Sequence, residues 1–184
     1  TDQDSYKILS DILPKDSYVY SSHLTRTIKT MDATIKEGFK YKEYCLDKKF
    51  GEQNLGEWQG LKYEKLQEIT KEINVFHPTW LCNPDYTPPG GESYNNLYNR
   101  VTSGIENIIK TRKEGDIVIF SHGGPIKAAI AHAIKADPNY TLPFWIDNLA
   151  VSRFDYLDNV CRVRFINLLP KIIYNSKNVY EGFI

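Results

Sequence analysis

The stretch DIVIFSHGGPIK, residues 116–127, ends an apolar run in a histidine that two glycines follow at once. Gly123 and Gly124 carry no side chains, so backbone amides at the start of a following helix can face an anion. The ring of His122 can donate a hydrogen bond to the same anion. These residues indicate an anion site, although a histidine that only caps the helix would produce the same local pattern.

A second stretch, SSHLTRT at residues 21–27, places Arg26 in the first turn of an expected helix. A guanidinium there presents a planar and permanently charged group that suits a phosphate. Taken alone, the stretch is explained more simply by a solvated arginine. His23 is interpreted as a surface residue.

Two carboxylates, Glu52 and Glu57, stand in a third stretch, FGEQNLGEWQG at residues 50–60. A carboxyl group packed near a tryptophan loses water, which raises its pKa toward values useful in a proton donor. Both glutamates qualify by type, and their spacing does not choose between them. The alternative is a pair of exposed loop carboxylates.

The other polar positions have structural interpretations. PPGGES, residues 88–93, predicts a tight turn before a helix, with Glu92 complementing the helix dipole. His77 precedes a proline in a loop and His132 lies within a helical pattern, so neither is expected to be catalytic.

Alternating strand and helix patterns must position these groups. Strands are expected at 17–22, 39–45 and 116–120, the last one apolar throughout and therefore buried on both faces of a parallel sheet. Helices are expected from residue 24 to Gly38, at 61–73, from the cap Ser93 to Gly115, and after Pro125. A polar loop with four prolines fills 76–89, and a hairpin joins 150–156 to 160–167 through the turn Leu157-Asp158-Asn159.

Strands that alternate with helices form right-handed crossovers. The sequence therefore predicts an α/β fold: a three-layer α/β/α sandwich with a mostly parallel sheet and an antiparallel edge. Ligands in such folds bind at the carboxyl ends of the strands. We accordingly expect Arg26, His122 and one of the two glutamates, Glu52 or Glu57, to gather around one anion pocket at the rim of the sheet.

Composition narrows the class of protein. The chain has 184 residues, of which 41% are hydrophobic, so one domain over residues 1–184 is expected. Lys plus Arg equals Asp plus Glu at 23 each and no basic stripe is visible, which favours a small-molecule partner over nucleic acid. The three cysteines lack the spacing of metal ligands, so we expect them to be buried free thiols in a reducing compartment. No apolar segment is long enough to cross a membrane, and we therefore expect a cytoplasmic protein.

Each pattern is weak alone, but their order resembles the histidine phosphatase superfamily, the phosphoglycerate mutase-like fold. The resemblance covers about residues 1–168 and is carried by SSHLTRTIKT, FGEQNLGEWQG, PPGGES, IVIFSHGGPIK and FWIDNLAVSRF. In that family one histidine accepts the phosphoryl group, a second histidine and arginines hold the phosphate oxygens, and a glutamate protonates the leaving oxygen.

The resemblance implies roles for individual residues. Arg26 matches an arginine that binds phosphate, with His23 where proline is more usual. Glu52 matches the acid, which decides between it and Glu57. His122 matches the second histidine, with the amide of Gly123 beside it as a phosphate-binding group. No metal and no cofactor is implied.

One family motif is absent. Members begin with a central strand that ends in Arg-His-Gly and supplies the nucleophilic histidine, and no such tripeptide occurs in the sequence. Either the chain lacks its first strand, which we favour, or it is a degenerate member that binds phosphate esters without turnover. Omitting a central strand would leave buried backbone groups of its neighbours unpaired, at about 1 to 3 kcal/mol each.

The resemblance therefore predicts a metal-independent phosphomonoesterase that works through a phosphohistidine, with the nucleophilic histidine upstream of Thr1 and little activity in residues 1–184 alone. Small phosphatases of the α-ribazole phosphatase-like type are the nearest match, because residues 61–89 form a short lid or insertion. Phosphoglycerate mutase-type transfer and a non-catalytic phosphate-ester-binding protein remain the alternatives. The expected partner is a small phosphorylated metabolite, with neither nucleic acid nor membrane, and a homodimer is left open.

Overall fold

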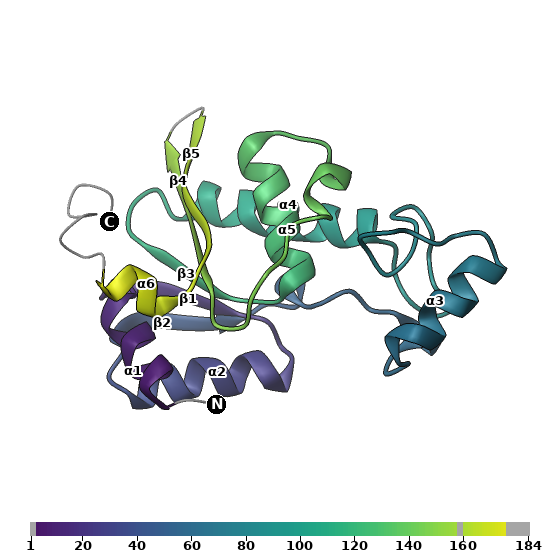
Figure 1. Cartoon of the computed structure of the whole chain (residues 1–184). Helices are drawn as coiled ribbons and strands as arrows, with labels where there is room; N and C mark the ends of the chain where they lie inside the picture. Colours follow the sequence, from purple (N-terminus) through teal and green to yellow (C-terminus); the bar gives the residue numbers. More distant parts are fainter. Residues whose placement is uncertain (1–2, 158–159, 176–184) are drawn as a thin grey trace.

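Three short parallel strands form the centre of the fold (Figure 1). The computed structural model describes residues 3–157 and 160–175. The strand order is β2-β1-β3, with β1 at Ser17–Ser21, β2 at Tyr41–Leu46 and β3 at Ile117–Phe120. β1 is therefore the central strand, and its alternating burial places Ser17, Val19 and Ser21 in the interior.

Helices cover both faces of this sheet, as predicted (Figure 1). On one face lie α1 (Gln3–Ile12) and α2 (Thr25–Lys36), whose Leu9 and Met31 pack with Val19 and Phe120. On the other face lie α4 (Tyr94–Thr111) and α5 (Gly123–Ile134), which contribute to a second core. The short helices η3 (Pro138–Thr141) and α6 (Pro170–Asn175) complete these layers.

The predicted antiparallel pair is present as β4 (Val151–Leu157) and β5 (Val160–Leu168). It confirms the mixed α/β class, but the two strands form a sheet of their own. Within the described residues, the hairpin has no ladder of hydrogen bonds to the parallel sheet. Two residues of the predicted turn, Asp158 and Asn159, lie outside the described residues.

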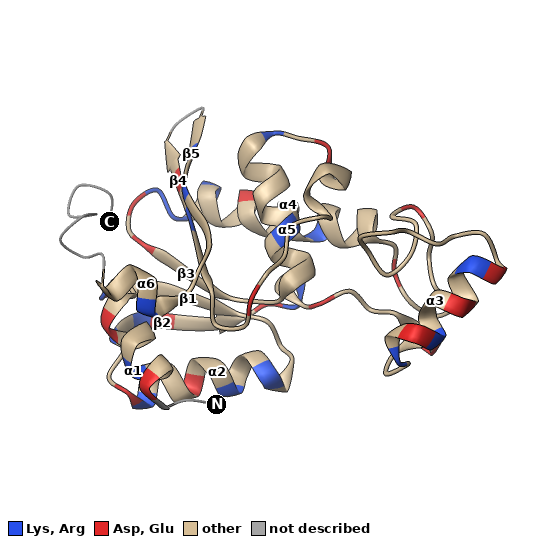
Figure 2. Cartoon of the chain, viewed as in Figure 1, with Lys and Arg blue, Asp and Glu red and all other residues tan. Residues whose placement is uncertain are grey.

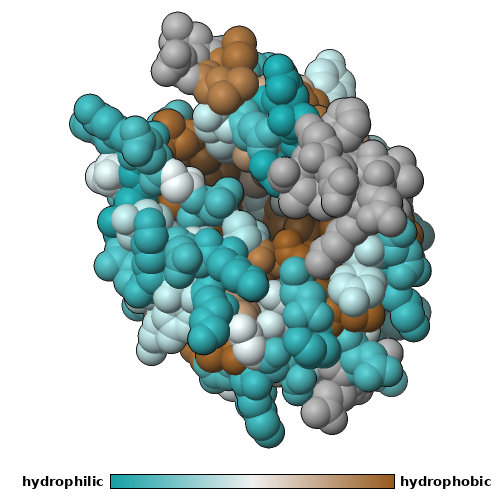
Figure 3. All heavy atoms as spheres, turned by 90° about the vertical axis from the view of Figure 1, so that its left-hand side faces the viewer, coloured by the Kyte–Doolittle hydropathy of each residue, from teal (hydrophilic) through white to brown (hydrophobic). Residues whose placement is uncertain are grey.

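The prediction that the third strand is buried on both faces is wrong at Ile119, which is 37% exposed. The physical reason is the edge position of β3: in the part of the chain that the structure describes, it pairs only with β1. Val118 and Phe120, on the other face, are buried as expected. Seen from the left-hand side of Figure 1, the surface of the molecule has a hollow with hydrophobic atoms inside it (Figure 3).

Two smaller predictions are also corrected. α4 ends at Thr111 rather than at Gly115, because Arg112 leaves the helix to lie over the ring of Tyr18 at 4.0 Å. Gly115, with φ of +102°, instead forms the turn into β3. Of the three cysteines predicted to be buried, Cys82 is buried, Cys161 is partly exposed, and Cys45 is exposed because it lies on the edge strand β2.

The segment 61–89 projects from the sheet and its helices (Figure 1). It contains α3 (Tyr63–Glu72) and follows the short helix η2 (Gly56–Trp58). A small core of its own, with Trp58 stacked on Tyr86 at 5.5 Å, holds it together. Acidic and basic residues are interspersed along α3 (Figure 2). Among the described helices, none combines the length and apolar character needed to span a membrane.

Candidate functional site

The carboxyl ends of the three parallel strands meet at one edge of the sheet. The amide of Ser22, just after β1, donates to the carbonyl of Phe120 at the end of β3 at 2.9 Å. The amide of Asp47, just after β2, donates to the carbonyl of Ser21 at 2.9 Å. The segments that follow these strands therefore leave the sheet side by side, and each carries one of the predicted site residues.

Arg26 and His122 are in direct contact. Nε of Arg26, in the first turn of α2, donates to Nδ1 of His122, at the N-cap of α5, over 3.0 Å. A guanidinium can only donate, so Nδ1 must accept and the proton of the neutral ring lies on Nε2. Nε2 lies 2.9 Å from Oγ of the buried Ser22 and donates to it.

The ring of His122 is held in its neutral form. Burial is the main cause, and the positive charges of Arg26, His23 and Arg100 act in the same direction, so that the pKa of His122 falls to about 4. The residue is 8% exposed. At neutral pH it is therefore a positioned imidazole with one donor nitrogen and one acceptor nitrogen.

The side chain of Glu52 packs beside the first turn of the same helix, α5. Glu52 follows the short helix η1 (Lys48–Phe50), and its carboxylate accepts from the amides of Gln53 at 3.0 Å and Gly124 at 3.4 Å. Burial raises the pKa of Glu52 and outweighs these two amides and the nearby arginines, which act to lower it. Glu57, the other carboxylate of this stretch, is exposed in η2.

The two glycines after His122 have different surroundings. A β-carbon at Gly124 would collide with the Glu52 carboxylate and lie 3.2 Å from Leu97, so the close approach of Glu52 requires glycine there. A β-carbon at Gly123 would meet nothing within 4 Å. The first turn of α5 is therefore packed on the Glu52 side and open beside Gly123.

Arg100 fixes the segment that carries Glu52, although nothing in its local sequence distinguishes it from a surface arginine. From α4 it donates to the carbonyls of Lys49 at 2.7 Å and Glu52 at 3.0 Å. It also forms two hydrogen bonds with Glu92, at 2.7 and 2.9 Å. Glu92 in turn accepts from the amide of Asn54 at 2.9 Å, so it does more than complement a helix dipole.

Two serines that directly follow strands also hold the site residues in place. Oγ of Ser121 donates to the carbonyl of Phe50 at 2.7 Å, which ties the end of β3 to the segment before Glu52. Ser22 holds the ring of His122 from the other side. Their position directly after two neighbouring buried strands is the signal that could have identified them.

The remaining histidines lie in different surroundings. His23 is exposed as expected, yet its ring lies close to Gly51, and its charge helps to lower the pKa of His122. Nδ1 of His132 lies 2.9 Å from the hydroxyl of Tyr156, and Nδ1 of His77 accepts from the amide of Thr79 at 3.3 Å. Across residues 3–157 and 160–175, no group of three or more His, Cys, Asp or Glu side chains is arranged to hold a metal ion.

The chain belongs to the histidine phosphatase superfamily (branch 1), whose sequence model matches residues 8–169. Among curated proteins it is 32% identical over 127 residues to the bifunctional protein Rv2228c of Mycobacterium tuberculosis. That match covers 68% of this chain but 34% of the relative, so the chain corresponds to about a third of that protein. It is also 29% identical over 149 residues to phosphoserine phosphatase 1 of Hydrogenobacter thermophilus, covering 79% and 68% of the two chains.

Solved structures show the same fold. A putative α-ribazole-5′-P phosphatase from Escherichia coli superimposes with a TM-score of 0.74 at 20% identity, covering 90% of this chain and 80% of that one. A phosphoglycerate mutase from Bacillus anthracis gives 0.73 at 21% identity, covering 95% and 81%. The predicted phosphoglycerate mutase-like architecture is therefore confirmed.

Proposed function

We propose that this chain carries the phosphate-binding and proton-donating groups of a metal-independent phosphomonoesterase that acts on a small phosphate ester through a phosphohistidine. The contact between Arg26 and His122 beside Glu52 is the observation that supports it most directly. It joins a permanent cation, a neutral imidazole and a carboxyl group of raised pKa at the edge of the sheet where α/β proteins bind ligands. Relatives named as phosphatases agree with it.

The proposed roles follow from the contacts. In the described part of the chain no residue accepts a hydrogen bond from the two Nη nitrogens of Arg26, so they are available to phosphate oxygens. The amide of Gly123 lies on the same rim and is proposed to bind phosphate together with Arg26. The ring of His122 orients the Arg26 guanidinium, and it would bind phosphate itself by exchanging the Ser22 partner of Nε2 for a phosphate oxygen. Because its raised pKa favours the protonated form, Glu52 supplies the proton that the leaving oxygen needs.

The reaction balances in two steps. A histidine nitrogen attacks phosphorus while the bond to the leaving oxygen breaks, and that oxygen takes the proton of Glu52. The Glu52 carboxylate then removes a proton from water, which attacks the phosphohistidine and releases phosphate. Glu52 is thereby protonated again, and the cycle needs no metal.

The nucleophile is proposed to come from a segment upstream of Thr1. Both ring nitrogens of His122 are engaged, one with Arg26 and one with Ser22, which argues against His122 itself. The edges that β3 and β4 leave unpaired among the described residues could receive an additional strand, and its carboxyl end would lie beside His122. The segment 61–89 is proposed to close over the site as a lid.

Two lengths of chain test the proposal. Residues 1–184 should bind inorganic phosphate in calorimetric titrations and lose that binding in Arg26→Met. A longer chain that includes the natural upstream residues should hydrolyse phenyl phosphate in excess chelator. Phosphate binding without turnover in the longer chain would instead support a non-catalytic binding protein, and loss of turnover in chelator would contradict a metal-independent mechanism.

Glu52→Gln and Glu57→Gln make a matched pair in the longer chain. Removing a general acid lowers kcat by about 10² to 10⁴. We therefore expect a loss of that order with phenyl phosphate for Glu52→Gln, and a smaller loss with 4-nitrophenyl phosphate, whose leaving group is a stable anion. The exposed Glu57→Gln should retain the activity of the wild type. Equal effects of the two substitutions would exclude Glu52 as the acid.

A further inference from the structure

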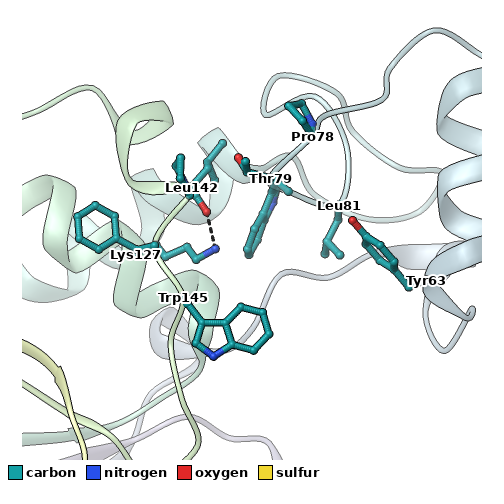
Figure 4. Close-up of a pocket in the computed structure, with 10 residues that line it drawn as sticks. Tyr63, Pro78, Thr79, Leu81, Lys127, Leu142 and Trp145 are labelled. Atoms are coloured by element: carbon teal, nitrogen blue, oxygen red, sulfur yellow. Dashed lines mark hydrogen bonds between the residues drawn. The ribbon is translucent and has the colours of Figure 1, made fainter.

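A cleft of about 580 Å³ opens between the projecting segment 61–89 and the chain that follows η3 (Figure 4). Tyr63 and Leu81 line it from the projecting segment, and Trp145 lines it from the opposite side. Lys127 is the single charged side chain among the ten residues that surround it. The volume lies within the range of about 300 to 1,000 Å³ that is usual for small-molecule sites.

The cleft adjoins the proposed reacting groups. Lys127 lies three residues after Gly124 in α5, on the same side of the helix, and Gly124 donates to Glu52. Trp80 also lines the cleft, and its Nε1 donates to Oε1 of Gln53 at 3.0 Å. Gln53 is the residue that directly follows Glu52 in the sequence. A leaving group whose oxygen is near Glu52 would therefore extend into this cleft.

Lys127 is a buried cation with spare donors. It is 8% exposed, and Nζ donates to the carbonyl of Leu142 at 2.6 Å while lying 4.4 Å from the ring centre of Trp80. An ammonium has three donors, and one of them is used within the described residues. In the described part of the chain no carboxylate forms an ion pair with Lys127. Burial lowers the pKa of Lys127 and outweighs the nearby carboxylate of Glu52, which acts to raise it. An anionic ligand group in the cleft would compensate the cost of that burial.

Trp145 offers a flat apolar surface on the other side of the cleft. The residue is 78% exposed, although its Nε1 donates to the carboxylate of Asp147 at 2.9 Å and so restrains the ring. The indole lies across the cleft from Leu81 (Figure 4), and both Trp145 and Lys127 line the cleft. A planar ring of a ligand would cover this surface and stack on it.

We propose that the cleft binds the leaving group of the phosphate ester, and that this group is an aromatic ring bearing a carboxylate. The ring would lie against Trp145 and the carboxylate would accept from Nζ of Lys127. The proposal rests on the proposed function only for the position of the phosphate. The residues that line the cleft are given by the structure and do not depend on the proposed function.

Stable phosphonates test it on residues 1–184 without turnover. Methylphosphonate probes the phosphate site alone, phenylphosphonate adds the ring, and 3- and 4-phosphonobenzoate add the carboxylate; calorimetry gives each Kd. Stacking should tighten phenylphosphonate by about 2- to 10-fold over methylphosphonate. A hydrogen bond from a charged donor should tighten the better phosphonobenzoate by a further factor of about 10.

Variants separate the two parts of the cleft. Trp145→Ala should bring the ratio of phenylphosphonate to methylphosphonate affinity close to one, whereas Tyr140→Ala, an aromatic residue 76% exposed outside the cleft, should leave that ratio unchanged. Lys127→Met should remove the preference for phosphonobenzoate over phenylphosphonate. If Lys127→Met fails to fold, the Trp145→Ala variant still tests whether the aromatic ring binds in the cleft, because Trp145 is exposed.

The outcomes distinguish this inference from the proposed function. Equal affinities for methylphosphonate, phenylphosphonate and both phosphonobenzoates would overturn the inference and leave the phosphate site intact. Failure of every phosphonate to bind would overturn both. Binding of benzoate alone that Lys127→Met abolishes, with no binding of methylphosphonate, would support the cleft and contradict the phosphate site.

Discussion

The hydroxyl of Ser22 lies 2.9 Å from Nε2 of His122, although one hundred residues separate them in the sequence. Arg26 approaches the same ring from its other nitrogen. The imidazole is therefore held at both ends by residues that follow β1, while it stands itself at the end of β3. Parallel pairing of two strands is what allows a local serine and arginine to orient a distant histidine.

Ser22→Ala should disturb this arrangement. The Nε2–H of His122 would lose its buried partner, which costs about 1 to 3 kcal/mol, measured as the free energy of unfolding in urea at pH 7. Nitrogen NMR of the ring should show less of the Nε2–H tautomer. Ser21→Ala is the matched control, because Oγ of Ser21 donates to the carbonyl of Ser22 and does not contact the ring. A ring spectrum that is identical in all three proteins would contradict the assignment.

The pKa of His122 predicts a pH dependence of stability. Its folded value of about 4 lies below the ordinary value of 6.5, so between these values the unfolded chain binds more protons than the folded one. Stability is therefore fully present above pH 6.5 and is lost as the pH falls from 6.5 to 4, by at most about 3 kcal/mol.

The comparison that isolates this effect uses His122→Gln. Because groups remote from residue 122 titrate alike in both proteins, the difference in unfolding free energy between wild type and variant should shrink as the pH falls from 6.5 to 4. Urea denaturation at half-unit steps measures it. A difference that stays constant over that range would show that His122 is not held neutral.

The sequence was most informative where a strand ends and a helix begins. Glycine, serine and apolar runs mark these junctions locally, so the positions of Arg26 and His122 could be predicted before their contact was known. Glu52 could be separated from Glu57 only by a family resemblance, because burial in the folded protein distinguishes them and spacing does not. Arg100 could not be predicted, since its partners are carbonyl groups brought near it by the fold.

The prediction that β3 is buried on both faces was wrong for a related reason. Apolar character from residue 117 to 120 shows that β3 is a strand, but it does not show how many neighbours it has. The exposure of Ile119 depends on the separation of the hairpin from the parallel sheet, which is a property of the assembled strands.

Substitutions at the two glycines should have unequal effects. Gly124→Ala forces the Glu52 carboxylate to move, and we expect a loss of about 1 to 3 kcal/mol in unfolding free energy. It should also shift the pKa of Glu52, measured by carboxyl carbon NMR. Gly123→Ala adds a methyl group in open space and should be neutral or slightly stabilising by the helix propensity of alanine. Similar effects of both would show that Glu52 does not pack on Gly124.

The pairing of Arg100 with Glu92 should be energetically coupled. Both side chains are largely covered, with 24% and 19% exposed, and Arg100 also holds two carbonyls. A double-mutant cycle with Arg100→Met and Glu92→Gln should give a coupling of about 1 to 3 kcal/mol. The same cycle on Lys65 and Glu68, which are 60% and 67% exposed, should give less than about 1 kcal/mol. Equal coupling energies for the two pairs would contradict the role of the Arg100–Glu92 pair in supporting the segment that carries Glu52.

The unpaired edge of β3 can be detected residue by residue. The amides of Tyr18 and Ser22 donate to the carbonyls of Asp116 and Phe120, so the even-numbered residues of β3 direct their backbone groups toward β1. By the alternation of a parallel strand, the amides of Ile117 and Ile119 point to the opposite edge, where no described strand pairs with them.

Amide hydrogen exchange of residues 1–184 should therefore alternate within one strand, with Ile119 faster than Val118 and Phe120 by at least about tenfold. The neighbouring amides are an internal control, because they share the temperature, pH and global stability of the same molecule. In a longer chain whose upstream segment adds a strand between β3 and β4, Ile119 should become as protected as Val118. Equal protection in residues 1–184 alone would show that this edge is already covered and would contradict an upstream strand there.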